Sequence, residues 1–197
     1  MVNEWQYFEN KLNINERESQ IILGTLLGTS SIIYPEKSKN PHLLMRSNKK
    51  NSIWIRCKAF ELKKFSRPKS FIEDQYSYRW NSISTELLLP YYKIFYKNKN
   101  KQITLNLLES LKPLSICCWF LDKGFINDTE CGFKLLEDKK SNKNILKYFS
   151  LLDLPLIKKN SHNYIFSESK NVLSFFNIIK NHIPNEIKKN ILNHLEF

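Results

Sequence analysis

Two short segments of this 197-residue chain carry chemically active side chains at the ends of similar apolar helical turns. Residues 22–30 end in Thr29 and Ser30, and residues 116–124 end in Asp122, Lys123 and Gly124. Paired carboxylates at such ends would hold Mg²⁺, which demands hard oxygen ligands. A threonine hydroxyl is a poor substitute for an anionic ligand, and the positive charge of a lysine repels a divalent cation. The duplication predicts one fold of two related units whose helix ends meet.

The first segment belongs to a predicted helix over residues 15–27. Asn15 is a suitable N-cap, and Glu16 and Glu18 fall in the first turn. Gly24 and Gly28 lie four residues apart and share a face, which favours close approach of another backbone. A helix that simply ends at Gly28 is the alternative, and both interpretations are compatible.

Short β-like runs separated by polar turns follow this helix. Residues 48–51 are typical of a hairpin loop, residues 85–96 show helical spacing, and the basic run 97–101 is the best linker candidate. Alternating aromatic and polar residues predict the last strand of this half. The predicted strands are 31–34, 42–47, 52–59 and 76–82.

The second half repeats this order. Helices are predicted over 104–111, 114–121, 146–152, 172–182 and 187–195, and strands over 124–136 and 163–167. The sequence therefore predicts an α/β fold of the α+β type, α-β-β-α-β-β-α twice over, without the regular alternation of a parallel sheet.

Composition favours a folded protein with an anionic partner. Hydrophobic residues make up 42% of the chain, and the formal net charge is +12. Nucleic acid is the commonest partner of such a charge, and a merely solubilising surface is the alternative. Four cysteines without metal-ligand spacing indicate a reducing compartment, and no membrane span or targeting peptide is evident. Abundant Lys, Asn and Ile suggest an A/T-rich genome, such as that of a mitochondrion or other organelle, without identifying the compartment.

The ordered set of motifs resembles the single-chain, two-motif LAGLIDADG homing endonucleases. Residues 22–28 are similar to the first motif of that family, and residues 119–124 are similar to the second. Lys101, Gln102 and Ile103 precede the second motif helix as a Lys-x-Ile sequence does in the family. Ile183-Pro184, followed by Lys189, matches the C-terminal landmark. The resemblance covers nearly the whole chain and implies two halves, 1–100 and 101–197, in one compact pseudo-twofold domain.

The resemblance implies two central motif helices packed side by side and two antiparallel β-saddles along the nucleic acid. Packing residues would be Gly24, Gly28 and Cys118. Thr29 and Lys123 stand where the family has its two metal-binding acids, so this member is degenerate. Asp122 matches the acidic residue before the second acid, and Lys101 and Lys189 match basic residues that stabilise developing charge.

We therefore expect a cleavage-deficient binder without catalytic residues, metal or cofactor, monomeric because its symmetry is internal. RNA is favoured over duplex DNA, with a role as a maturase-like splicing factor or as a component of an organellar ribosome or other ribonucleoprotein. One alternative is an active DNA homing endonuclease that holds Mg²⁺ through Asp122 with Asp128 or Glu130. A DNA-binding regulator or scaffold is the other.

Basic residues near the predicted hairpins are the candidate contacts with nucleic acid. If residues 52–59 form a strand, Arg46, Arg56 and Lys58 alternate along one strand pair and share a surface. We favour a core position for Trp54. The candidates are Arg46, Lys49, Lys50, Arg56 and Lys58 in the first half, and Lys134, Lys139, Lys140, Lys143, Lys158 and Lys159 in the second.

Overall fold

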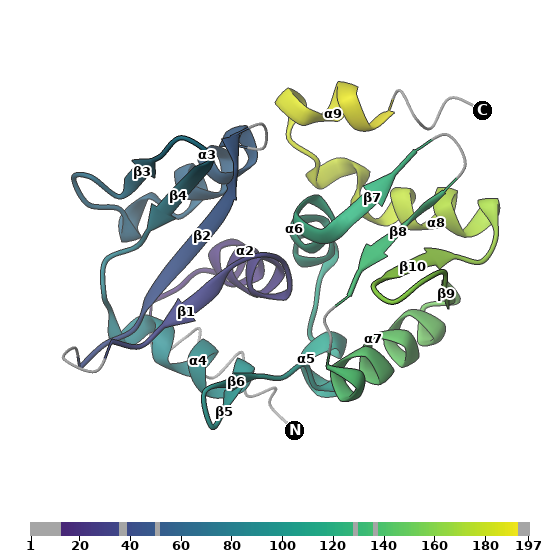
Figure 1. The fold of residues 1–197 in the computed structure, drawn as a ribbon, viewed down its shortest axis with the longest axis horizontal. Helices are drawn as coiled ribbons and strands as arrows, with labels where there is room; N and C mark the ends of the chain where they lie inside the picture. Colours follow the sequence, from purple (N-terminus) through teal and green to yellow (C-terminus); the bar gives the residue numbers. More distant parts are fainter. Residues whose placement is uncertain (1–12, 36–38, 50–51, 128–129, 136–137, 193–197) are drawn as a thin grey trace.

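The fold consists of two similar halves around a central pair of helices (Figure 1). The computed structural model describes residues 13–35, 39–49, 52–127, 130–135 and 138–192. Each half contains a four-stranded antiparallel sheet whose first strand follows directly on one of the central helices. The architecture is therefore α+β with two sheets, as the sequence predicts.

In the first half, the sheet has the strand order β1-β2-β4-β3. The register places Ser31 opposite Leu44, and Arg46 opposite Arg79. The elements are α2 (Glu16–Leu27), β1 (Ser31–Ile33), β2 (His42–Asn48), α3 (Ser52–Glu61), η2 (Lys63–Phe65), β3 (Phe71–Glu73), β4 (Ser77–Asn81), η3 (Glu86–Leu88) and α4 (Leu89–Phe95).

In the second half, the sheet has the equivalent order β7-β8-β10-β9. A two-stranded hairpin of β5 (Tyr96–Lys97) and β6 (Asn100–Lys101) leads into it. The remaining elements are α5 (Leu105–Glu109), α6 (Pro113–Lys123), β7 (Gly124–Ile126), β8 (Cys131–Lys134), α7 (Lys139–Leu151), β9 (Leu156–Lys158), β10 (Asn163–Phe166), α8 (Ser169–Ile179), η4 (Lys180–His182) and α9 (Asn185–Leu192).

Helices α2 and α6 pack against each other through glycines. A Cβ atom added to Gly24 would lie 2.2 Å from the carbonyl oxygen of Ser115, and one added to Gly28 would lie 2.3 Å from Oδ2 of Asp122. The backbone N–H of Gly28 also donates to the carbonyl of Gly24 and closes the helix, with φ at −80°. Gly28 thus leaves space for the second helix and caps its own, and neither role needs left-handed backbone.

The N-terminus of α2 is fixed by the residues that the sequence indicates. The side chain of Asn15 accepts a hydrogen bond from the backbone of Glu18, and the carboxylate of Glu18 accepts one from the backbone of Asn15. This reciprocal capping box satisfies two N–H groups that the helix itself leaves unpaired.

Aromatic side chains fill the core of the second half. Trp119 and Phe120 on α6 contact Phe133 on β8 with ring centroids 4.8 and 5.5 Å apart. Phe149 on α7 and Phe175 on α8 contact the same ring. These contacts set the position of α6, and with it the place where its last residues meet the first half.

The prediction of a strand over residues 52–59 was wrong, because this segment forms helix α3. Its buried residues are Trp54, Ile55, Lys58 and Ala59, which follow helical spacing. One of those positions is a lysine, so the apolar stripe is hidden in the sequence. The predicted hairpin loop 48–51 therefore joins a strand to a helix.

The linker prediction and two short strands also differ between sequence and structure. The candidate linker 97–101 forms the turn and second strand of the β5–β6 hairpin, with Asn98 and Lys99 at φ 51° and 64°. Strands β3 and β9 have only three residues each, and the sequence analysis did not identify them. Short edge strands carry little periodicity, so local pattern alone does not reveal them.

Candidate nucleic-acid interface

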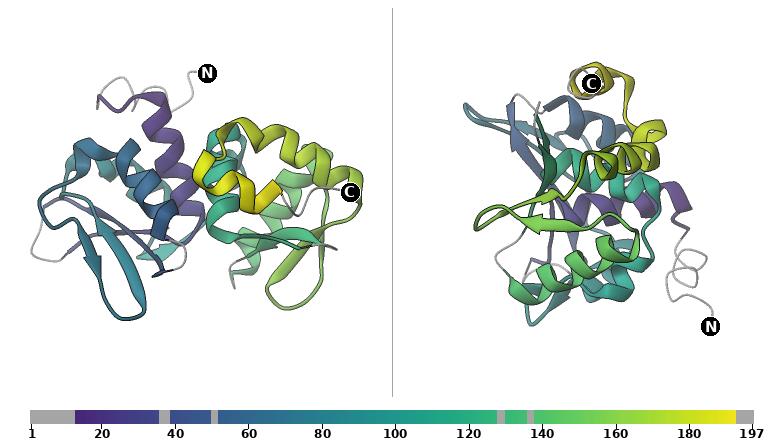
Figure 2. Two further views of the ribbon diagram at one scale, coloured as in Figure 1. Left: turned by 90° about the horizontal axis from the view of Figure 1, so that it is seen from above. Right: turned by 90° about the vertical axis from the view of Figure 1, so that its right-hand side faces the viewer.

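Both sheets turn one face away from the helices, and the β3–β4 and β9–β10 hairpins project on that same side (Figure 2, left). We call this side the open face. On the first sheet it carries Ser31, Leu44, Arg46, Arg79 and Asn81, whose strand neighbours Ile32, Met45, Tyr78 and Trp80 are buried. On the second sheet it carries Phe125, Gly132, Lys134, Ile157, Asn163 and Ile165.

Arginines dominate the open face of the first sheet. Arg46 is exposed on β2 and lies opposite Arg79 on β4. Arg79 is half-exposed and forms an ion pair of 3.1 Å with Asp74. Arg79 was missed in the sequence analysis, although its place between Tyr78 and Trp80 puts it on the opposite face of a strand that was predicted. The pair presents two guanidinium groups to any ligand along this sheet.

Other predicted contacts of the first half are dispersed. Lys49 is exposed just after β2 and pairs with Glu73 at 2.9 Å. Arg56 lies on α3, with its guanidinium carbon 5.0 Å from the ring centroid of Tyr78. Lys58 is buried on α3, so it cannot share an exposed strand surface with Arg46. Lys50 lies outside the described residues.

In the second half, only Lys134 among the predicted lysines lies on the open face, exposed on β8. Lys158 is exposed on the edge strand β9, and Lys159 forms an ion pair with Glu130. The other predicted lysines lie on α7, which covers the opposite face of the sheet: Lys139 and Lys140 in its first turn, and Lys143 one turn later.

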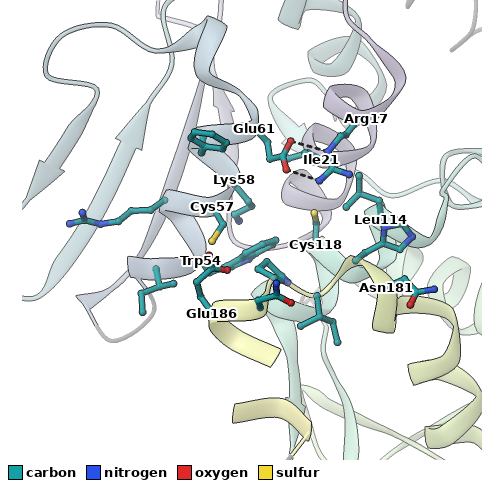
Figure 3. Close-up of a pocket in the computed structure, with 17 residues that line it drawn as sticks. Arg17, Ile21, Trp54, Cys57, Lys58, Glu61, Leu114, Cys118, Asn181 and Glu186 are labelled. Carbon is teal, nitrogen blue, oxygen red and sulfur yellow. Dashed lines mark hydrogen bonds and ion pairs between the residues drawn. The ribbon is translucent and has the colours of Figure 1, made fainter. Parts of the chain in front are cut away.

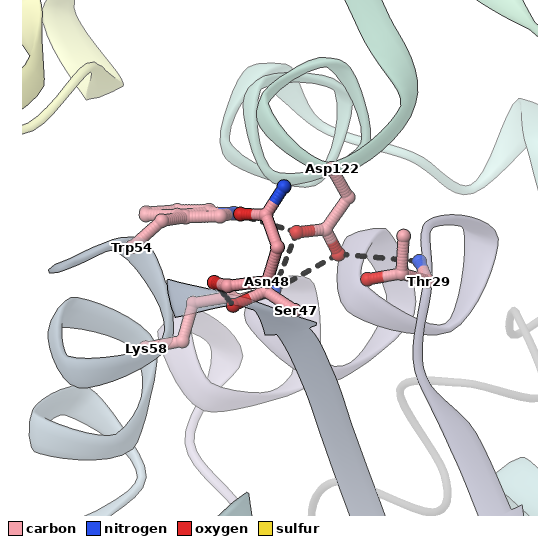
Figure 4. A network of polar contacts seen from close by, with 6 residues as sticks. All are labelled: Thr29, Ser47, Asn48, Trp54, Lys58 and Asp122. Atoms are coloured by element: carbon pink, nitrogen blue, oxygen red, sulfur yellow. Dashed lines mark hydrogen bonds and ion pairs between the residues drawn. The ribbon is translucent and has the colours of Figure 1, made fainter. Parts of the chain in front are cut away.

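The ends of the two central helices meet at Asp122 (Figure 4). Its Oδ1 accepts hydrogen bonds of 2.7 Å from both Trp54 Nε1 and Lys58 Nζ. Its Oδ2 accepts from Lys58 Nζ at 2.9 Å and from the backbone N–H of Thr29 at 3.5 Å. The side chains of Lys58 and Asp122 are only 1% and 4% exposed.

This network gives Asp122 a structural task. Both carboxylate oxygens are engaged by donors, and the charge is neutralised by a lysine at hydrogen-bonding distance. A buried carboxylate needs such a counter-ion because desolvation of an unpaired charge is very costly. Trp54, predicted to belong to the core, is buried and forms one wall of the network.

Two lysines lie near the same helix ends. Lys101 Nζ donates a hydrogen bond of 3.1 Å to the carbonyl of Ser30, just beyond α2. Burial, reinforced by the nearby positive charge of Lys123, lowers the pKa of Lys101 to about 8, against an opposing effect of Asp122. Cations suit the C-terminal ends of helices, where unpaired carbonyl groups concentrate negative potential.

The hydroxyl of Ser30 is an unusual feature of this centre. Ser30 is 1% exposed, and within the described part of the chain its Oγ has no hydrogen-bond partner.

Thr29 and Lys123 occupy the two helix-end positions where the sequence lacks acids. The side chain of Lys189, on α9, is outside the described portion. Within the described residues no grouping of three His, Cys, Asp or Glu side chains could hold a metal ion.

A separate groove lies between the helices, with a volume of about 780 Å³ (Figure 3). Helices α2 and α3 form one side, and residues 181–186 form the other. Phe60 and Ile53 at its rim are 73% and 51% exposed, and Arg17 pairs with Glu61 on the α2–α3 side at 2.6 Å. The buried thiol of Cys118 lines its floor, where burial raises the thiol pKa.

Two glycine-packed helices, each leading into a four-stranded antiparallel sheet, define the LAGLIDADG class of fold. The model of the LAGLIDADG DNA endonuclease family matches residues 19–173, and the chain belongs to this family. No curated protein matches the chain. No helix among the described residues is long and apolar enough to cross a membrane.

Solved structures share this fold at low sequence identity. The homing endonuclease I-WcaI bound to its DNA recognition sequence is 15% identical, with a TM-score of 0.77 over 89% of this chain and 86% of that chain. I-DmoI in complex with DNA and Ca is 13% identical, with a TM-score of 0.58 over 90% and 97%. The N-terminal LAGLIDADG domain of DUF199/WhiA is 14% identical, with a TM-score of 0.50 over 97% and 96%.

Proposed function

We propose that this protein binds nucleic acid without cleaving it, with structured RNA as its preferred ligand. The observation that carries this proposal is the state of Asp122, the one acid of the two motif ends. Its carboxylate is buried and held by Lys58 and Trp54, while Thr29 and Lys123 occupy the flanking helix ends. Metal-dependent hydrolysis of a phosphodiester needs oxygen ligands that are free to bind the ion.

Of the two acids considered as substitute ligands, the one that the structure describes is already paired. Glu130 is engaged by Lys159, and Asp128 lies outside the described residues. The cations that remain at the centre, Lys101 and Lys123, suit a phosphate group. We propose that they contact the backbone of the ligand directly, with no metal between protein and phosphate.

We infer the preference for RNA from the proposed absence of DNA cleavage. A member of a DNA endonuclease family that does not cut DNA has no role in homing, which leaves recognition as its function. A maturase-like splicing factor and a component of an organellar ribosome or other ribonucleoprotein both fit a basic chain of this kind. The RNA that co-purifies with the protein would distinguish these two roles.

The test combines binding and cleavage. Structured RNA and duplex DNA of equal length are compared by fluorescence anisotropy over a salt series, with EDTA or with Mg²⁺. We expect tighter binding of RNA, no dependence on Mg²⁺, and a steep loss of affinity with salt, since each neutralised phosphate adds roughly 0.9 to the slope on duplex DNA. A salt-independent affinity would show that the positive charge serves solubility alone.

For cleavage, duplexes enriched from a randomised pool by binding are incubated with Mg²⁺ or Mn²⁺. A specific double-strand break by the wild-type protein would refute the proposal. Thr29→Asp combined with Lys123→Asp is the matched variant, since it returns an acid to each helix end. We expect this variant to take up Mn²⁺ in titration calorimetry and the wild type to take up none.

A further inference from the structure

The open faces of the two sheets carry different kinds of side chain. The strand registers show which residues share each cross-strand row. On the first sheet, the row that starts two residues after Thr29 contains Ser31, Leu44 and Asn81. The next open-face row contains Arg46, Arg79 and Ile72, of which Ile72 is 41% exposed. Each of these two rows therefore combines one apolar residue with hydrogen-bonding or charged groups, which a surface for phosphates and base edges requires.

On the second sheet, the row that starts two residues after Lys123 is entirely apolar. Phe125, Gly132, Ile165 and Ile157 are consecutive cross-strand partners on β7, β8, β10 and β9. We call these four residues the apolar row. Ile157 is 49% exposed, and Phe125 and Ile165 are partly exposed.

Gly132 has no side chain, so the surface of the apolar row is depressed between its neighbours. A Cβ atom on Gly132 would lie 1.9 Å from the carbonyl oxygen of Tyr164, so no larger residue fits this strand position. The ring of Phe125 and the branched side chain of Ile165 flank the glycine on the two adjoining strands. The next row supplies Lys134 opposite Asn163, which places an exposed cation beside the apolar surface.

The apolar row is poorly suited to the groove of a duplex. Base edges in a groove present hydrogen-bond donors and acceptors, which would lose water there without gaining protein partners. The faces of unpaired bases are different, because they stack on aromatic and apolar side chains. The positive charge of Lys134 and of the chain as a whole suits the phosphates on either side of such bases.

We propose that the apolar row stacks against unpaired bases of an RNA loop or single strand, while Arg46 and Arg79 hold backbone on the first sheet. This inference rests on the proposed function, because it specifies which part of the RNA each half binds. The single chain thereby reads two different features of one ligand, a helical backbone with one sheet and exposed bases with the other.

The experiment compares two RNAs of equal length and charge, a stem with a randomised loop and a fully paired duplex, at one salt concentration. The wild type should prefer the looped RNA. Phe125→Leu keeps an apolar side chain but removes the ring, and should weaken binding of the looped RNA about 5- to 150-fold, the range expected for loss of one stacked base. Binding of the duplex should not change, and Phe125→Tyr should retain wild-type affinity.

Phe60→Leu is the matched control, because it removes an exposed ring on the helix side. It should leave both affinities unchanged, and melting temperatures should show that all variants fold. Equal weakening of both RNAs by Phe125→Leu, or no weakening of either, would overturn the inference while leaving the proposed function intact. Failure of the wild type to bind any RNA or DNA would overturn the proposed function as well.

Discussion

The buried pair of Lys58 and Asp122 leads to a prediction about stability. The replacement Lys58→Met keeps most of the side-chain volume but leaves the carboxylate of Asp122 buried without a counter-ion. The two charges lie 2.7 Å apart, with 1% and 4% of their side chains exposed. Removing one partner of such a pair costs about 3–5 kcal/mol, which corresponds to a fall in melting temperature on the order of 10 °C for a chain of this size.

Asp122→Asn should be similarly destabilising, because it leaves the lysine as an unpaired buried charge. The double variant Lys58→Met/Asp122→Asn leaves no buried charge at this site, and its amide oxygen can still accept the hydrogen bond from Trp54. We therefore expect the double variant to be more stable than either single variant. Urea unfolding of all four proteins closes a double-mutant cycle and gives the coupling energy directly.

The chain provides a matched control in the ion pair between Arg17 and Glu61. This pair also links α3 to one of the central helices, here α2, and is 2.6 Å long, but its side chains are 58% and 34% exposed. Arg17→Met should therefore cost less than about 1 kcal/mol. Additive effects in the Lys58 and Asp122 cycle, or equal costs for Lys58→Met and Arg17→Met, would refute the reasoning from burial.

Four further predictions concern the helix pair and the surface around it. Gly24→Ala should destabilise the protein by about 1–3 kcal/mol or more in urea unfolding, because its Cβ would lie 2.2 Å from a backbone carbonyl that cannot move away easily. Unchanged stability would contradict the close packing of α2 against α6. Because the pKa of Lys101 is lowered to about 8, affinity for RNA should fall as the pH rises through 8 and the amine loses its proton. The variant Lys101→Arg should keep its affinity for RNA over this range. A wild-type affinity that does not change between neutral pH and pH 9 would exclude a phosphate contact by Lys101. The same shift contributes stability that grows as the pH rises between about 8 and 10.5, since there the unfolded chain binds the proton that the folded chain has released. Burial raises the pKa of the thiols of Cys117, Cys118 and Cys131, which acts in the opposite direction over this range. The stability of the wild type relative to Lys101→Met should therefore increase with pH in thermal unfolding. Arg46→Gln should lower the salt slope of binding by about 1, whereas the same change at Lys147, exposed on α7, should not alter it.

Local signals in the sequence predict much of the fold correctly. Asn15 starts α2 as a capping residue, Gly24 and Gly28 mark the face where α6 packs, and the alternation of Tyr78 and Trp80 gives strand β4 and its buried face. These features depend on residues within one element or on the space that a missing side chain leaves. Such constraints are present in the sequence itself.

The centre of the candidate site could not be predicted in this way. Asp122 and Lys58 are 64 positions apart, and their pairing exists only because α3 is a helix that points one lysine toward the end of α6. A lysine in a buried stripe obscures the helical period, so the sequence predicts a strand and an exposed cation instead. Because residues 52–59 form a helix and not the predicted strand, Arg46, Arg56 and Lys58 do not lie in one row.

The buried pair of Lys58 and Asp122 also determines which segments can associate. If two copies of the first half met through α2, the two buried Lys58 side chains would lack the carboxylate that neutralises them. If two copies of the second half met through α6, two carboxylates would compete for the same space with like charge. Only the unlike combination places Lys58 beside Asp122 and balances both charges. The buried pair therefore favours association of unlike halves over self-pairing of either half.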